Sequence, residues 1–185
     1  NPTNCLVDIT PPAGVILSIG AGEAPQGDSF CSDITVTNFT DITEFQFSLN
    51  WNTANFSYNS ITLNPAIASA LLIDGAAAFG SIAVDWDGMG TALTLNDGDP
   101  IATICYDAVG PALSCDQATL TDVPLESEAI STASNGNNIG VTAQIGDWCI
   151  LSPNGFILVI PDEVVPVGDT ICMEVEVVGF TDILE

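Results

Sequence analysis

Apolar and polar residues alternate along most of the chain, and this period of two predicts β-strands rather than helices. In the segment FQFSLNW, strict alternation places Phe45, Phe47, Leu49 and Trp51 on one face, which we expect to be buried. Turns rich in Gly, Pro, Asn and Asp separate the alternating segments. The predicted strands cover residues 15–20, 30–37, 44–51, 57–63, 80–85, 92–95, 101–109, 117–121, 140–145 and 147–151.

Many short strands at this spacing are typical of a two-sheet β-sandwich or jelly roll. Only residues 65–73 suit a short helical turn. We therefore predict an all-β fold for residues 12–151, with almost no helix. Its core is expected to contain Phe45, Phe47, Leu49, Ile104 and Tyr106.

An internal repeat is the strongest signal of domain organisation. Residues 27–44 (GDSFCSDITVTNFTDITE) and 168–185 (GDTICMEVEVVGFTDILE) align without a gap, 141 positions apart, with nine of eighteen positions identical. The match continues upstream, where VILSIG at 15–20 corresponds to FILVIP at 156–161. We interpret residues 1–11 as the tail of a preceding repeat with its linker, 12–151 as one repeat, and 152–185 as a linker and the first strands of the next. Because two strands cannot bury a core, we expect the last segment to pack on a neighbouring chain or on a continuation of its own repeat.

Composition narrows the possible functions. The chain has 24 acidic residues, no Lys, Arg or His, and a formal net charge of −24, while 47% of its residues are hydrophobic. Without cationic side chains it cannot neutralise phosphates, which excludes nucleic acid as a direct partner and removes the clamps of phosphoryl transfer. Ser-His and Cys-His catalysis lack their base. The longest apolar stretch, residues 66–84, is interrupted by Asp74 and does not suit membrane insertion.

Six cysteines without a CxxC pair indicate disulfides and an oxidising compartment. We read the chain as a secreted segment, located outside the cell or on its surface.

Two turns contain candidate metal ligands. The sequences DWDG at 85–88 and NDGD at 96–99 offer the carboxylate oxygens of Asp85, Asp87, Asp97 and Asp99, which suit Ca²⁺. The alternative is that Asp-Gly and Asn-Asp simply form turns, since neither stretch continues into a full EF-hand spacing. No other cofactor is expected.

Two other candidate sites have ordinary explanations. Glu126 and Glu128 lie two residues apart on a predicted strand, where a solvated edge is favoured over a glycosidase pair. The three tryptophans, Trp51, Trp86 and Trp148, are candidates for stacking on a sugar. Alternation assigns Trp51 to the core, and Trp86, between two acids, is the candidate that we follow.

Several pieces of the chain, spread over residues 15–151, resemble cohesin domains in their order and spacing. They are PQGD at 25–28 followed by a Thr/Val strand, NFTDI at 38–42, FQFSLNW at 45–51, YNSI at 58–61, DGDPIATI at 97–104, YDAVG at 106–110, NGN at 135–137 and Gly146 before the last strand. Cohesins are jelly-roll sandwiches of about nine strands, found in cellulosomal scaffolds and other bacterial surface proteins. The resemblance implies that fold.

The resemblance also suggests two functions that the sequence leaves open. The cysteines and the lack of bases look more like the cohesin-like repeats of large secreted bacterial proteins than like cellulosomal cohesins. This favours a non-enzymatic structural repeat of an extracellular filament, stalk or adhesin, whose partners are neighbouring copies or repeats. The alternative is a recognition module that binds a dockerin-like protein or a carbohydrate on an exposed sheet face.

A disulfide pairing follows from the resemblance. In such a jelly roll the last strand runs parallel to the first, which implies that Cys149 lies near Cys31. Cys105 and Cys115 flank the turn at 109–112 and are ten positions apart, so we expect them to form the second pair. Cys172 matches Cys31, and Cys5 matches Cys149 after a three-residue loop change, so both would have partners in adjacent repeats. The alternative pairing is Cys5–Cys31 with Cys149–Cys172.

Overall fold

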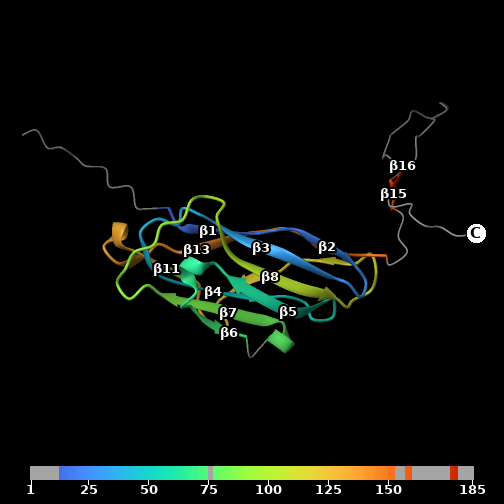
Figure 1. The fold of residues 1–185 in the computed structure, drawn as a ribbon, viewed down its shortest axis with the longest axis horizontal. Helices are drawn as coiled ribbons and strands as arrows, with labels where there is room; N and C mark the ends of the chain where they lie inside the picture. The colour runs from blue at the N-terminus through green and yellow to red at the C-terminus, as the bar shows by residue number, and fades with distance from the viewer. Residues whose placement is uncertain (1–12, 75–76, 153–156, 160–175, 179–185) are drawn as a thin grey trace, which may run out of the picture.

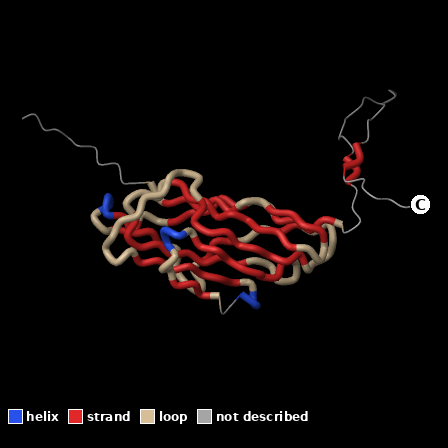
Figure 2. Tube along the Cα trace, viewed as in Figure 1, coloured by secondary structure: helices blue, strands red, loops and turns tan. Residues whose placement is uncertain are grey.

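The computed structural model describes residues 13–74, 77–152, 157–159 and 176–178. Two β-sheets pack face to face over the span from β1 to β14, and helical structure in the described residues is limited to three short 3₁₀ turns (Figures 1 and 2). The all-β sandwich predicted from alternation is therefore confirmed. In this part of the chain no helix is long and apolar enough to cross a membrane.

The first sheet is five-stranded, in the order β13–β1–β3–β8–β5. Its strands are β13 (Val141–Ile145), β1 (Val15–Ile19), β3 (Ser29–Thr37), β8 (Pro100–Ala108) and β5 (Phe56–Leu63).

The second sheet has the order β12–β11–β4–β7–β6, and β10 also pairs with β4. Its strands are β12 (Asn137–Asn138), β11 (Glu128–Ser131), β4 (Ile42–Asn50), β7 (Ser81–Asp87), β6 (Leu71–Ile73) and β10 (Thr119–Thr121). The 3₁₀ turns are η1 (Pro65–Ile67), η2 (Ala77–Phe79) and η3 (Thr132–Ser134).

Two smaller sheets complete the described structure. The order β2–β14–β9 joins β2 (Gly22–Pro25), β14 (Trp148–Leu151) and β9 (Cys115–Asp116). A separate ladder joins β15 (Ile157–Val159) to β16 (Glu176–Val178). The strands outnumber the nine or so that the cohesin resemblance implies, because several are only two to four residues long.

The beginning and the end of the sandwich lie side by side. β1 pairs in parallel with β13, and β2 pairs in parallel with β14. A parallel pair needs a long connection, and here almost the whole domain is that connection. The fold is therefore closed by contacts that are distant in sequence.

The core lies between the two large sheets and contains the residues that alternation predicted. Phe45 is 1% exposed, and Phe47, Leu49, Ile104 and Tyr106 are fully buried. An aromatic cluster fills one end of the core, where the Tyr106 ring lies 4.4 Å from that of Trp148 between ring centroids. Phe30 and Phe56 pack edge to face in the same cluster, with ring centroids 5.6 Å apart.

Differences from the predicted strands concern short elements. Residues 92–95 were predicted as a strand, but they form only an isolated antiparallel β-bridge between Leu93 and Ile42. The predicted helical turn at 65–73 is η1 followed by β6. The side chain of Asn64 accepts a hydrogen bond from the backbone N–H of Ala66, and Pro65 begins the turn, which is the usual chemistry of a helix start.

Removing the Phe45 ring tests the core. Phe45 packs edge to face on Phe39 with ring centroids 5.1 Å apart. We expect Phe45→Ala to lower the free energy of unfolding by about 3–5 kcal/mol, because it removes buried surface and leaves a cavity. The matched control is Phe79→Ala, since Phe79 is 85% exposed. Urea unfolding followed by tryptophan fluorescence measures both; equal effects would contradict this assignment of the core.

Candidate functional site

Four of the six cysteines form two disulfides, but with partners other than those predicted. Cys31 bonds to Cys105 and Cys115 bonds to Cys149, with Cα atoms 4.0 and 4.1 Å apart. The predicted pairs Cys31–Cys149 and Cys105–Cys115 are therefore wrong. The alternative that joins Cys31 and Cys149 to the terminal cysteines is wrong as well.

Strand neighbours explain the pairing. β3 lies beside β8, and the register places Cys31 directly opposite Cys105. β14 lies beside β9, where Cys149 is opposite Cys115. The sequence-based inference placed the end of β14 next to the start of β3, whereas β2 occupies the place beside β14. After β8 the chain leaves the five-stranded sheet for β9 in the smaller sheet, which separates Cys105 from Cys115 although they are only ten positions apart in sequence.

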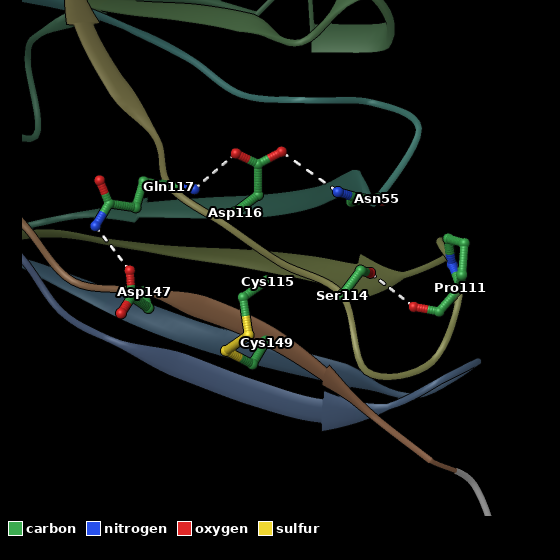
Figure 3. The surroundings of a disulfide bond; sticks show 8 residues. All are labelled: Asn55, Pro111, Ser114, Cys115, Asp116, Gln117, Asp147 and Cys149. Carbon is green, nitrogen blue, oxygen red and sulfur yellow. Dashed lines mark hydrogen bonds between the residues drawn. A yellow bond between two sulfur atoms is a disulfide. The ribbon is translucent and has the colours of Figure 1, made fainter.

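A polar network surrounds the Cys115–Cys149 disulfide (Figure 3). One carboxylate oxygen of Asp116 accepts a hydrogen bond from the backbone of Gln117, and the other accepts one from the side chain of Asn55. The side chain of Gln117 donates to Asp147 over 2.7 Å. The disulfide closes a separation of 34 residues, which chain-entropy arguments convert to about 4 kcal/mol. It therefore fastens the short last strand of the sandwich.

Cys5 and Cys172 lie outside the described residues. Their assignment to adjacent repeats stays a prediction.

Three of the four aspartates considered for calcium accept backbone hydrogen bonds in turns, and the four are not assembled into one site. Asp87 accepts a hydrogen bond from the backbone of Met89, Asp97 from that of Asn38, and Asp99 from that of Asn96. Asp85 points outward from β7. No group of three or more His, Cys, Asp or Glu suited to a metal ion exists among residues 13–74 and 77–152 or in the rest of the described chain. The turn explanation accounts for three of these aspartates.

All three tryptophans are buried, so none offers a surface for stacking on a sugar. Trp51, Trp86 and Trp148 are 7%, 5% and 0% exposed. Trp86 was the candidate that we followed for sugar stacking because acids flank it. Strand alternation decides otherwise, since β7 turns Trp86 inward opposite Phe45 and turns its acidic neighbours outward.

The outer surface of the second sheet carries carboxylates on three neighbouring strands. We call this surface the acidic face and define it by Glu44, Asp85, Asp87 and Glu128. Glu44 on β4 lies directly opposite Asp87 on β7. Gln46, two residues further along β4, lies between Glu128 on β11 and Asp85 on β7.

The electrostatics of the acidic face are unfavourable within this chain. Like charges directly opposite each other on neighbouring strands are destabilising, and no side chain of the sequence carries a positive charge. The carboxylates of Glu44, Asp85 and Glu128 accept no hydrogen bond from any of the described residues. Leu71, opposite Asp85 on β6, is 61% exposed and adds apolar surface at the border.

On the outer surface of the five-stranded sheet, acidic side chains accept hydrogen bonds from neighbouring side chains. Asp107 accepts hydrogen bonds from Ser29 over 2.6 Å and from Asn59 over 2.9 Å. These two bonds lower the pKa of Asp107. Asp33 accepts a hydrogen bond from Thr103 over 2.6 Å. Asp33 and Asp107 are therefore hydrogen-bonded to neighbouring side chains. On the acidic face, only Asp87 among the four acids accepts a hydrogen bond from the described residues, and its donor is the backbone of Met89.

Sequence reasoning found parts of the acidic face but not the face itself. Alternation in β4 and β7 already shows that Glu44, Asp85 and Asp87 share the outward phase with each other. What it does not show is that β4 and β7 are neighbours, or which residues lie opposite each other. Asp85 and Asp87 were considered only for calcium, and Glu128 only as part of a glycosidase pair.

Non-reducing peptide mapping tests the disulfides. The chain has no Lys or Arg for trypsin, so cleavage has to use chymotrypsin or a glutamate-specific protease. We expect peptides that join Cys31 to Cys105 and Cys115 to Cys149. Replacing Cys115 and Cys149 together by Ser should lower the free energy of unfolding by about 2–5 kcal/mol. Recovery of Cys31 with Cys149 would contradict the structure.

The hydrogen bonds to Asp107 predict a pH effect. Because its folded pKa is lowered, Asp107 contributes stability above its ordinary unfolded pKa, and this contribution is lost as the pH falls through the folded value. We expect Asn59→Ala to raise the pKa of Asp107 in a carboxyl ¹³C NMR titration. The control is Gln144→Ala, an exposed change on β13. An unchanged Asp107 titration in the Asn59 variant would show that this bond does not hold the carboxylate.

Comparison with known proteins rests on structure. No protein-family model matches the sequence, and no curated protein matches it by sequence comparison. The cohesin of a type I cohesin–dockerin complex from Clostridium thermocellum matches with a TM-score of 0.62 at 16% identity, over 77% of this chain and 97% of that one. The seventh type I cohesin of the scaffold protein ScaB from Pseudobacteroides cellulosolvens gives 0.61 at 12%, over 86% and 99%.

A non-cellulosomal cohesin from the archaeon Archaeoglobus fulgidus is also similar, with a TM-score of 0.58 at 17% identity, over 76% of this chain and 92% of that one. The three neighbours are matched over nearly their whole length at low sequence identity. Such similarity establishes architecture, and the sandwich described here is accordingly a cohesin-like domain in its fold.

Proposed function

We propose that the sandwich is a protein-recognition module that binds a dockerin-like partner through the acidic face. The observation that carries this proposal is the pair Glu44 and Asp87, which lie directly opposite each other in a chain without a cationic side chain. A partner that presents Lys or Arg to this pair removes a repulsion as well as forming an ion pair. The partner therefore supplies the charge that the chain lacks.

The structural neighbours support a role in protein binding. Cohesins from Clostridium thermocellum and Acetivibrio cellulolyticus were solved in complex with dockerins. Those cohesins share the two-sheet architecture of this chain and bind a protein partner. Recognition is therefore a better use of this fold than catalysis, and the missing His, Lys and Arg fit that preference.

The border of the acidic face adds the apolar contact that a specific interface needs. Leu71 is well exposed on β6, and Ile130 on β11 is half-buried in the outward phase beside Glu44. Charges steer the encounter and select the partner, while apolar side chains contribute buried area. Binding on this face should weaken as salt screens the charges.

The structural-repeat role is the second candidate, and the 141-residue repeat favours it. Tandem cohesin-like domains with internal disulfides would form an extracellular filament, stalk or adhesin on a bacterial surface, with neighbouring repeats as partners. Recognition and structural roles are compatible, since a stalk presents its domains to ligands. A filament in electron micrographs of native material, with a spacing near one domain length, would support this role.

Carbohydrate binding has less support, because the tryptophans are buried.

Relief of the repulsion is measurable without a partner. We expect Glu44→Gln to raise the free energy of unfolding by about 0.2–1 kcal/mol, since it removes one of two opposed charges. Glu44→Lys should stabilise the domain further by pairing with Asp87. Both effects should shrink in 1 M NaCl. If Glu44→Lys is less stable than the parent at low salt, the two carboxylates do not oppose each other as the register states.

Binding is tested directly with a panel of purified bacterial dockerins and immobilised chain, at 50 and 500 mM NaCl. We expect at least one dockerin to bind, and the affinity to fall at least tenfold in the double variant Glu44→Gln, Asp87→Asn. The matched control is Asp33→Asn, Asp107→Asn on the opposite sheet, which should change affinity less than twofold. No binding by any dockerin, or equal losses in both variants, would overturn the proposal.

A further inference from the structure

The short ladder of β15 and β16 repeats the pairing of β1 and β3. In the sandwich, Ile16 pairs with Thr37 and Leu17 with Val36. In the ladder, Ile157 pairs with Val178 and Leu158 with Val177. Each residue of the ladder lies 141 positions after its counterpart, and so does the third pair, Val159 with Glu176, relative to Ser18 with Thr35. The repeat in the sequence is therefore also a repeat in strand register.

Register carries more information than sequence similarity. Two strands of this kind can pair in several alignments, and a slip by one residue would exchange their two faces. The ladder adopts the alignment that places counterparts opposite counterparts in all three of its pairs. Its strands also run antiparallel, as β1 and β3 do.

The pattern of apolar residues agrees with the same assignment. The sandwich buries Leu17, Ile19, Ile34 and Val36 completely or nearly so. Their counterparts 141 positions later are all apolar in sequence: Leu158, Ile160, Val175 and Val177. The outward residues Asp33 and Thr35 correspond to the acids Glu174 and Glu176, which suit a solvated side. The second segment thus keeps the residue pattern that one buried face requires.

We propose that β15 and β16 are the opening strands of a second cohesin-like domain, and that strands of the β13 and β8 type complete them. In the sandwich, β1 has β13 in parallel on its other edge, and β3 has β8 antiparallel on its other edge. The open edges of the ladder are therefore completed by the remaining strands of a second copy of this fold. The proposal does not depend on binding at the acidic face.

The proposal also assigns a partner to Cys172. Cys172 is the counterpart of Cys31, which bonds to Cys105 on the neighbouring β8. The β8-type strand that completes β16 would carry the matching cysteine. Each copy then closes this disulfide within itself, so consecutive domains are joined by the polypeptide alone and not by this bond.

An exchange of segments within the full chain tests the equivalence. Residues 15–44 are replaced by the sequence of 156–185, which has the same length and ends, like 15–44, on a Glu. We expect the exchanged chain to unfold cooperatively and to bond the transplanted Cys172 to Cys105. The control exchange uses 155–184, which shifts every strand by one residue and should abolish both. If the shifted exchange folds and bonds to Cys105 as well as the aligned one does, the proposal is overturned.

An extension of the chain provides a second measurement. Residues 45–151 are added after Glu185, the counterpart of Glu44, so that 156–185 opens an uninterrupted second copy. We expect a second protease-resistant domain and a bond from Cys172 to the added copy of Cys105. Val177→Asp should abolish the second domain and spare the first, because its counterpart Val36 is fully buried. Glu176→Gln, on the outward side, is the matched control and should be tolerated.

If the correctly aligned exchange fails to fold and the added residues stay protease-sensitive, β15 and β16 are not the opening strands of this fold. Success of either measurement, with its control behaving as stated, supports the proposal.

Discussion

The constraint behind this structure is that it has to be built without a single cationic side chain. No Lys, Arg or His is available to neutralise the 24 acids, so the fold depends on apolar burial, backbone pairing and disulfides. The acids of the five-stranded sheet are accommodated by hydroxyl and amide donors, as at Asp107 and Asp33. On the acidic face no side chain of the described residues donates a hydrogen bond to the four acids, and Asp87 alone accepts one from the backbone. That difference distinguishes the two surfaces.

The disulfides act where strands distant in sequence are paired. The sandwich is closed by pairing of its first and last strands, and these contacts span nearly the whole domain. A four-residue last strand would be a weak closure alone. The Cys115–Cys149 bond fastens it, and the Cys31–Cys105 bond ties the two central strands of the five-stranded sheet. Covalent links thus reinforce two strand pairs, β3 with β8 and β9 with β14, whose members are far apart in sequence.

Protein recognition and tandem repetition follow from different features of the molecule. Recognition is inferred from opposed carboxylates on one sheet, and repetition from strand register in a separate ladder. The two are compatible because the ladder repeats β1 and β3, which belong to the sheet opposite the acidic face. A chain of such domains could therefore extend through its repeats while each domain keeps its acidic face for a partner.

The sequence by itself determined what local patterns can encode. Alternation identified the long strands and the buried face of β4, and self-similarity identified the repeat, because both depend only on the order of residues along the chain. Only the tertiary structure decided which strands are neighbours. That decision paired Cys31 with Cys105, turned Trp86 into the core, and set Glu44 opposite Asp87. Each depends on register between strands far apart in sequence, which no local pattern specifies.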